Sequence, residues 1–197
     1  MPLSDKQIKK LCPGGSGMPK MVSPFIRTQE GFPSYGLGPF GYDIRLGNTI
    51  RIFKDNVLID PSADVSDLEN TNEMHVFNVP IGQQFVVHPH TTVIVESLEQ
   101  FRMPDDVMGW IVGKSTYTRL GLILSATVIE PGWRGRLKFA VINPTAARIK
   151  LNSGAGIAQV IFDNGEKPEL SYSGRYQDQG INVDEPTSDD EEDEGEE

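Results

Sequence analysis

Apolar and polar residues alternate along most of this chain, in short segments that turn residues separate. A clear example runs from Glu130 to Asn143, EPGWRGRLKFAVIN, where a tight turn precedes an expected β-strand. In this strand Leu137, Phe139 and Val141 share one face, because side chains alternate between the two faces of a strand. The opposite face carries Arg136, Lys138, Ala140 and Ile142.

Further strand-like segments follow one another after residue 20. They cover residues 49–53, 74–79, 84–89, 91–97, 106–113, 120–129, 135–143, 147–151 and 157–162. Turn signals such as Pro131-Gly132 and Asn143-Pro144 separate them, and helical periodicity is almost absent. The pattern predicts an all-β fold, either a sandwich or a closed, jelly-roll-like barrel.

Two short helices are expected. One covers residues 4–11, with Ser4 as its N-cap, and the other covers residues 114–121, where Gly121 suits the position after a helix C-terminus. We therefore expect four parts along the chain. They are an N-terminal helix and loop over residues 1–20, one β-barrel domain over 21–165, a polar C-terminal arm over 166–183 and an acidic tail over 184–197.

Charge is distributed unevenly along the 197 residues, whose formal net charge is −10. The tail holds ten of the 28 acidic residues and no basic one, so we expect it to be disordered. It is interpreted as a solubilising segment or as a segment that docks a basic protein. The other 18 acidic residues balance 18 lysines and arginines without a basic block, which argues against direct binding of nucleic acid.

Composition also limits the compartment and the metal chemistry. No apolar run reaches the roughly 18 residues of a membrane helix, and the N-terminus lacks the apolar core of a secretory signal. Cys12 is the single cysteine, so a reducing cytoplasm is expected. It forms no zinc-binding pattern with His75, His88 and His90, so we expect surface histidines and no zinc.

Two segments carry candidate binding chemistry. In VGKSTYTRLG (residues 112–121), Ser115 and Thr116 offer hydroxyl groups to phosphate and Arg119 adds a positive charge. The spacing is not that of a Walker A loop, and an ordinary capped helix is the alternative interpretation. In the arm, SYSGRYQDQ (residues 171–179) could form a lid over a charged ligand, although its composition favours an unstructured segment.

A third segment, SYGLGPFGYDIRLG (residues 34–47), is rich in glycine and aromatic residues. It ends with Asp43 and Arg45, two residues apart on one strand face. We expect these two to form a buried or inter-subunit pair with a structural role.

Five segments together resemble the dCTP deaminase family of the dUTPase superfamily. In family order and spacing they are residues 34–47, GKSTYTRLGL (113–122), IEPGWRGRLKFAVIN (129–143), GAGIAQVIF (154–162) and residues 171–179. The resemblance spans residues 29–180. It implies a distorted β-barrel of the dUTPase fold and a homotrimer with sites between subunits. It also implies hydrolytic deamination of dCTP to dUTP and ammonia, with Mg²⁺ bound through the nucleotide's triphosphate.

The resemblance implies roles for individual residues. The residues implied to hold the triphosphate are Lys114, Ser115, Thr116 and Arg119, with Tyr172, Arg175 and Gln179 closing over it from the arm. Arg175 stands where the family usually has lysine. Val128, Glu130 and Trp133 would line the pocket for the base and sugar, and Ser115 and Glu130 are the catalytic candidates. Asp43 and Arg45 match a signature that supports the trimer core.

The chain departs from the family pattern at one central position. The family's catalytic glutamate, which passes the proton of the attacking water to the pyrimidine, falls on Ala140. A general base contributes about 10²–10⁴-fold to a rate, so deamination in the family's manner should be slow or absent. Lys138 on the same face is a poor replacement, because it would need a strongly depressed pKa. Glu130 or Asp178 are the other candidates.

Several functions therefore stay open. The chain could be a dCTP deaminase with a replacement base, or a dUTPase-type diphosphatase in which Glu130 positions water. It could also bind a nucleotide without catalysis, as a sensor or regulatory protein. A pyrimidine substituted at C5 could fill the space that the missing glutamate leaves.

Overall fold

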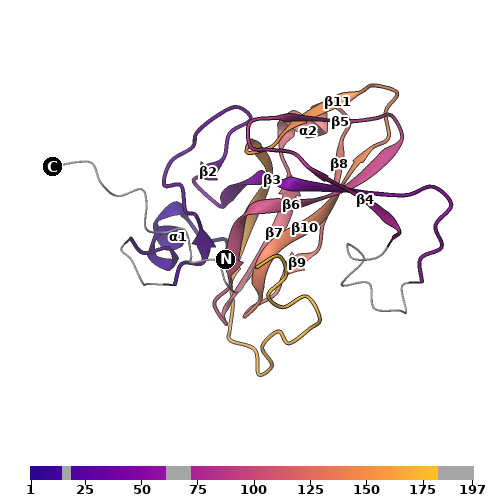
Figure 1. Cartoon of the computed structure of the whole chain (residues 1–197). Coiled ribbons are helices and arrows are strands. Elements are labelled where there is room, and N and C mark those ends of the chain that lie inside the picture. Colours follow the sequence, from indigo (N-terminus) through magenta and orange to yellow (C-terminus); the bar gives the residue numbers. More distant parts are fainter. Residues whose placement is uncertain (15–18, 61–71, 182–197) are drawn as a thin grey trace.

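The computed structural model describes residues 1–14, 19–60 and 72–181, and the acidic tail lies outside these ranges. Over the described residues the regular secondary structure is almost all β-strand, as the sequence predicts (Figure 1). The main sheet is antiparallel and curls into a distorted half-barrel, with the strand order β8-β10-β6-β3-β12-β7-β9. These strands are β3 (Tyr42–Phe53), β6 (Thr91–Arg102), β7 (Val107–Gly113), β8 (Ile123–Ser125), β9 (Val128–Ile129), β10 (Arg134–Asn143) and β12 (Gly156–Asn164).

Shorter strands extend this sheet at its sides. β1 (Val22–Ser23) pairs with β6, while β2 (Gly36–Leu37) and β4 (Met74–Asn78) pair with β3. A separate two-stranded sheet joins β5 (Gln84–Val87) to β11 (Ile149–Asn152).

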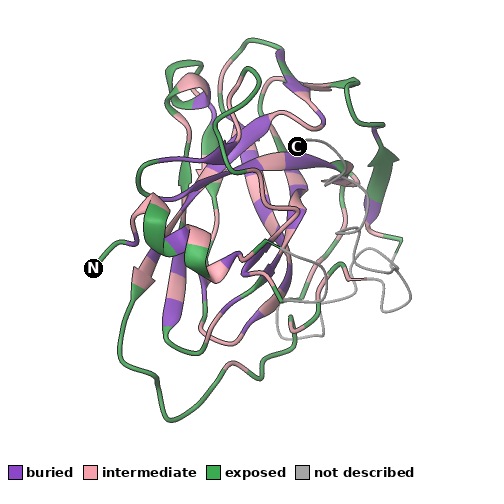
Figure 2. Cartoon of the chain, turned by 90° about the vertical axis from the view of Figure 1, so that its left-hand side faces the viewer, coloured by how far each residue is buried: buried purple, intermediate pink, exposed green. Residues whose placement is uncertain are grey.

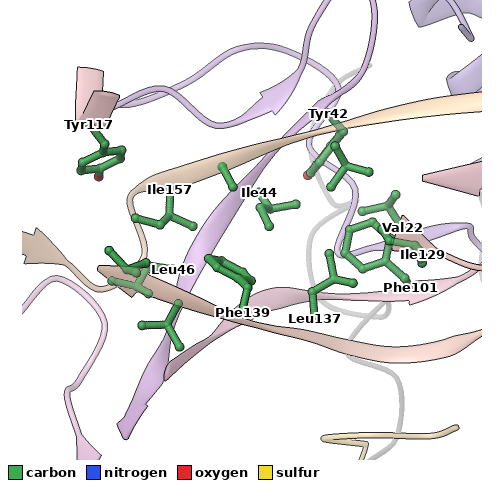
Figure 3. Close-up of a cluster of buried hydrophobic side chains, with 14 of the residues drawn as sticks. Val22, Tyr42, Ile44, Leu46, Phe101, Tyr117, Ile129, Leu137, Phe139 and Ile157 are labelled. Atoms are coloured by element: carbon green, nitrogen blue, oxygen red, sulfur yellow. The ribbon is translucent and has the colours of Figure 1, made fainter. Parts of the chain in front are cut away.

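The core lies inside the curl of the sheet. Along β10 buried and half-buried residues alternate, and Leu137, Phe139 and Val141 are all buried, so the predicted face is confirmed. Figure 3 shows Leu137 and Phe139 among apolar side chains from β3 and β6, including Ile44 and Phe101. Full burial of each such side chain contributes roughly 1.5–3 kcal/mol. The alternating pattern thus decides which face of β10 remains available for a ligand.

Both predicted helices form. α1 (Asp5–Leu11) begins after Ser4, whose backbone N–H donates to Gln7 Oε1 at 3.0 Å. It packs Ile8 into the core and exposes its outer side (Figure 2). α2 (Ser115–Arg119) is followed by Gly121, whose φ of 83° is the left-handed geometry expected there. Neither helix is long and apolar enough to cross a membrane, as far as the described residues show.

Two strand boundaries differ from those expected. The strand expected over residues 49–53 is the second half of β3, which starts at Tyr42 because Tyr42, Ile44 and Leu46 all enter the core. Gly41 just before β3 and Gly47 within it are weak strand formers, so the sequence does not mark this half as a strand. The single segment expected over residues 120–129 is divided, because β8 pairs with β10 whereas β9 pairs with β7.

Asp43 and Arg45 do not pair with each other, and each has another partner. The Asp43 carboxylate bonds the Lys114 ammonium. Arg45 Nε lies 2.7 Å from Glu99 Oε1, and the Arg45 backbone N–H donates to Glu99 Oε2 at 2.9 Å. Each side chain therefore bonds a residue from another element, Lys114 at the start of α2 or Glu99 on β6, and not its neighbour along β3. Both pairs lie within one chain and are largely buried.

An irregularity in the pairing of β6 with β10 determines which residues of the two strands lie opposite each other on the outer face of the sheet. The register shifts between Arg136 and Lys138, and Ser97 fills the interruption by accepting a bond from Leu137 N–H at 2.9 Å. After the shift, Lys138 lies opposite Glu96 and Ala140 lies opposite Ile94.

Candidate functional site

A cavity of about 550 Å³ opens between the outer face of the sheet and the C-terminal arm. It brings together five residues that the sequence assigns to the ligand, namely Val128, Glu130, Trp133, Tyr172 and Gln179. Most of its other lining is apolar and includes Phe53, Met74, Ile94 and Ile111. An apolar pocket with a few polar groups is the usual form of a small-molecule site.

A tight turn positions Glu130 and Trp133 at this cavity. Trp133 N–H donates to the Glu130 carbonyl at 3.2 Å, which closes a four-residue turn around Pro131 and Gly132. Gly132 has a φ of 78°, so a residue without a side chain suits its place in the turn. The result is an exposed Glu130 at the edge of the cavity and a buried Trp133 in its wall.

The C-terminal arm is bound to the start of β10. Gln179 accepts from Arg136 N–H at 2.8 Å with its carbonyl and donates to the Arg136 carbonyl at 3.0 Å with its side chain. Trp133 Nε1 donates to the Tyr176 carbonyl at 2.8 Å. The arm is thus packed against its own chain, and its composition wrongly suggested an unstructured segment over the part described.

Asp178, one of the candidate replacement bases, is engaged elsewhere. Its Oδ2 atom lies 2.8 Å from Arg134 Nη2 in an exposed ion pair, and its backbone N–H donates to the Arg134 carbonyl at 2.9 Å. The side chain therefore helps to fix the arm, and it does not line the cavity.

The residues expected to hold phosphates gather on and beside α2. Ser115 and Arg119 are exposed, and Thr116 is half-buried. Lys114 is bonded to Asp43 and, at 3.3 Å, to Ser34 Oγ. None of these four lines the cavity, and Arg175 of the arm does not line it either. Figure 1 shows α2 at the end of the molecule that holds β5 and β11, with β9 and the arm at the opposite end.

Tyr117 fixes α2 to the barrel. Its hydroxyl donates to the Gly156 carbonyl at 2.9 Å, and its ring is buried. Burial raises the pKa of Tyr117 to about 12, because the charged phenolate would lose its hydration. The neutral hydroxyl is therefore a permanent donor near neutral pH, and it holds the exposed Ser115 and Arg119 in place.

Ala140 borders the cavity without lining it. It is half-buried and lies between Ser125 of β8 and Ile94 of β6. Ile94 lines the cavity, as does Lys138, two residues before Ala140 on the same face.

The cavity also contains Arg51, a residue to which the sequence analysis assigned no role. Arg51 is buried on β3, and its Nη1 and Nη2 atoms each lie 3.2 Å from Glu96 Oε2. The register places Arg51 opposite Ile94. An arginine within TIRIF reads as an ordinary outward residue of an alternating strand, so only the neighbouring strands reveal its position at the cavity.

The histidines lie on the surface, as expected, because His75, His88 and His90 are all exposed. Within residues 1–14, 19–60 and 72–181, no three or more His, Cys, Asp or Glu side chains gather in a way that could hold a metal ion.

Comparison with known proteins decides the family. A family model described as dCTP deaminase-like matches residues 3–165. The chain belongs to the dCTP deaminase-like family. It is 36% identical over 182 residues to a dCTP deaminase of Campylobacter concisus, covering 88% of this chain and 91% of that protein. It is 38% identical over 168 residues to a dCTP deaminase of Campylobacter fetus, covering 81% of this chain and 86% of that protein.

A solved structure supports the fold. The crystal structure of 2′-deoxycytidine 5′-triphosphate deaminase from Agrobacterium tumefaciens aligns with a TM-score of 0.55 and 23% sequence identity. The alignment covers 66% of this chain and 40% of that one. The distorted barrel expected from the resemblance is therefore the fold of this chain.

Proposed function

We propose that this member of the dCTP deaminase-like family binds a pyrimidine deoxynucleoside triphosphate in sites between the subunits of a homotrimer. One observation carries the proposal. The residues expected to hold the base meet residues of the closing arm in one cavity. The residues on and beside α2, which are expected to hold phosphates, lie at the opposite end of the same molecule. A second copy that presents its α2 to this cavity would complete the site.

Exposed apolar side chains support the presence of an interface. Trp110 and Val112 on β7 and Ile123 on β8 are 46%, 37% and 52% exposed. Large apolar side chains that stay exposed mark surfaces that a partner covers. We assign these side chains to contacts between copies of the chain.

Within such a site Ser115, Thr116 and Arg119 would bind the triphosphate by charge-assisted hydrogen bonds. Val128 and Trp133 would hold the base and sugar, and Tyr172, Arg175 and Gln179 would close over the ligand. Mg²⁺ would enter on the phosphate oxygens, because it is commonly held by one or two protein groups together with substrate phosphates. The described residues offer no cage of acidic side chains for it.

We further propose that the chain does not deaminate this ligand by the family's route. The glutamate that the family uses to move the proton of water corresponds to Ala140, an alanine between Ser125 and Ile94. Methyl groups cannot accept a proton, and Asp178 is held by Arg134 outside the cavity. Nucleotide binding is therefore the function that the site supports best, in a sensor or regulatory role.

Calorimetric titration of the full chain with dCTP and with dUTP, in the presence of Mg²⁺, tests the binding. We expect saturable binding that Arg119→Met weakens by at least about tenfold, since a charge-assisted bond to phosphate is lost. Arg102→Met removes another exposed arginine, at the end of β6, and should leave the affinity unchanged. Absence of binding for both nucleotides would contradict the proposal.

Diphosphatase activity is the second candidate, and the position of Glu130 favours it. Glu130 is an exposed carboxylate that lines both the main cavity and a neighbouring one of about 470 Å³. A carboxylate beside a magnesium-bound triphosphate can orient water for attack on phosphorus. Release of pyrophosphate from dUTP that Glu130→Gln abolishes and Glu166→Gln preserves would establish this activity.

Two further parts of the proposal rest on the sequence. The acidic charge of residues 184–197 suits a contact with a basic protein, and the single Cys12 suits a cytoplasmic location. A substituent at C5 of the pyrimidine would have room beside Ala140.

A further inference from the structure

Three arginines gather where β6 ends and β10 begins. The register places Arg134 directly opposite Arg102, and Arg136 follows Arg134 on the same face of β10. Arg102 is exposed, and the side chain of Arg134 is 43% exposed. Like charges directly opposite each other on neighbouring strands are destabilising, and nearby negative charge offsets their repulsion.

Among the described residues, acidic side chains pair with one of these three arginines. Asp178 Oδ2 lies 2.8 Å from Arg134 Nη2. Arg136 donates to the backbone carbonyl of Leu98, which carries no net charge. In the same described part of the chain, the side chain of Arg102 has no bonding partner. Two positive charges of this surface therefore lack a carboxylate partner there.

The acids that follow Arg102 along the chain lie against other groups. Asp105 Oδ2 lies 2.6 Å from Lys167 Nζ, and Asp106 lines the smaller cavity of about 470 Å³. Neither of them forms an ion pair with Arg102.

The described chain ends beside this basic surface. Gln179 is bonded to Arg136 at both the N–H and the carbonyl, and a Cβ on Gly180 would come within 3.2 Å of Arg136 Cβ. Ile181 is the last described residue, and the tail begins three residues later. Three residues span at most about 10 Å, whereas neighbouring strands lie about 4.8 Å apart. The first acids of the tail are therefore within reach of all three arginines.

The tail carries the charge that this surface lacks. Residues 184–197, DEPTSDDEEDEGEE, hold ten acidic residues and no basic one. Contacts between exposed charges of opposite sign need no fixed conformation of the tail, and salt screens them.

We propose that residues 184–197 dock on their own chain, over the basic surface formed by Arg102, Arg134 and Arg136. A basic protein that binds the tail must then displace it from these arginines. None of the three lines the main cavity, so docking is independent of nucleotide binding and should leave nucleotide affinity unchanged.

Cross-linking with a water-soluble carbodiimide tests the contact. The reagent joins an amine to a touching carboxylate as an amide, with loss of water and without a spacer. Arg102→Lys keeps the positive charge and supplies the amine. Arg148→Lys makes the same change at an exposed arginine beyond the opposite end of β10, as a matched control. Both variants are full-length, and no nucleotide is added.

In dilute salt we expect Arg102→Lys to form a link to an acid of residues 184–197 within one chain, in higher yield than Arg148→Lys. Mass spectrometry identifies the linked peptides, and denaturing electrophoresis separates links within one chain from links between chains. At 1 M salt, where the screening length is about 3 Å, the yield should fall to that of the control.

Equal yields from the two variants in dilute salt, or a yield from Arg102→Lys that 1 M salt does not lower, would overturn ionic docking at this surface. Links found between chains and not within one chain would overturn docking on the same chain, and they would assign the surface to the tail of a neighbouring copy.

A second measurement follows the competition with a basic partner. Fluorescence titration with labelled decalysine should give about two- to fivefold tighter binding to Arg102→Met than to wild type, because an exposed ion pair no longer holds the tail. Arg148→Met should bind decalysine as wild type does. Equal affinity of Arg102→Met and wild type would contradict the proposal.

Discussion

At the scale of single residues, Glu99 shows how strongly the barrel depends on one partner. The side chain has no exposed surface, and Arg45 supplies both a guanidinium and a backbone bond to its carboxylate. Burial raises the pKa of Glu99 above its ordinary value, and Arg45 counteracts that rise. Removal of Arg45 would leave a carboxylate inside the barrel without its compensating charge.

We therefore expect Arg45→Met to lower the unfolding free energy at pH 7 by about 3–5 kcal/mol, the usual effect of breaking a buried pair. The pKa of Glu99 rises further in the variant. The loss of unfolding free energy should therefore shrink as the pH falls, because the folded variant takes up a proton on Glu99. Denaturant titrations at several pH values measure this, with Arg148→Met as an exposed control. A small deficit that does not change with pH would contradict the assignment.

Residue types alone could predict part of this picture. Leu137, Phe139 and Val141 show their face by alternation, and the Pro131-Gly132 turn is readable because those residues favour it. The contacts of Arg51, Arg45 and Asp43 could not be predicted in this way. Each depends on which strands become neighbours and in which register, and these properties follow from packing the whole barrel.

At the scale of elements, α2 owes its position to one side chain. The helix covers only Ser115–Arg119, and a helix of this length is not stable by itself in water. Tyr117 anchors it through a buried ring and the bond to the Gly156 carbonyl. The exposed groups expected to bind phosphate are thus carried by a short element that a tertiary contact holds in place.

Tyr117→Phe should consequently lower the unfolding free energy by about 1–3 kcal/mol, because the Gly156 carbonyl loses its partner while the ring stays buried. Tyr35→Phe removes a weaker, exposed hydroxyl contact to Glu30 and should change the unfolding free energy by less than about 0.5 kcal/mol. Urea denaturation of both variants makes the comparison. Equal effects would show that the Tyr117 hydroxyl does not anchor α2.

The arm illustrates what composition misses in an element. Residues 171–179 are polar and contain no apolar periodicity, so nothing local predicts order. Order comes from backbone groups of β10 and from the Trp133 indole, which bond the arm at Gln179 and Tyr176. The residue types alone left a lid over a charged ligand as one interpretation of this segment, and the resemblance to a family favoured it.

At the scale of the whole molecule, the separation of α2 from the cavity leads to a specific prediction for mixed oligomers. If the site forms between copies, a subunit with a damaged α2 and one with a damaged arm can together build an intact site. The variant Arg119→Met damages α2 and Tyr172→Ala damages the arm, and these two parts lie at opposite ends of the molecule. A site within one chain would give no such rescue.

We expect each variant alone to bind nucleotide at least about tenfold more weakly than wild type. Trimers assembled from both together should recover a fraction of full-affinity sites. Co-expression with two different tags, purification through both and calorimetric titration measure this fraction. Sedimentation equilibrium checks that the mixed species contains three chains. Uniformly weak binding in the mixed trimer would contradict sites between subunits.

The most direct test of the central claim is a measurement of ammonia and nucleotide products from dCTP with Mg²⁺, on wild type and on Ala140→Glu. We predict that wild type binds nucleotide and releases no ammonia, whereas the variant, with the family's carboxylate beside Lys138 and Ile94, releases ammonia and dUTP. Release of ammonia by wild type at the rate of the variant would contradict this prediction. That result would show that another group of this chain moves the proton.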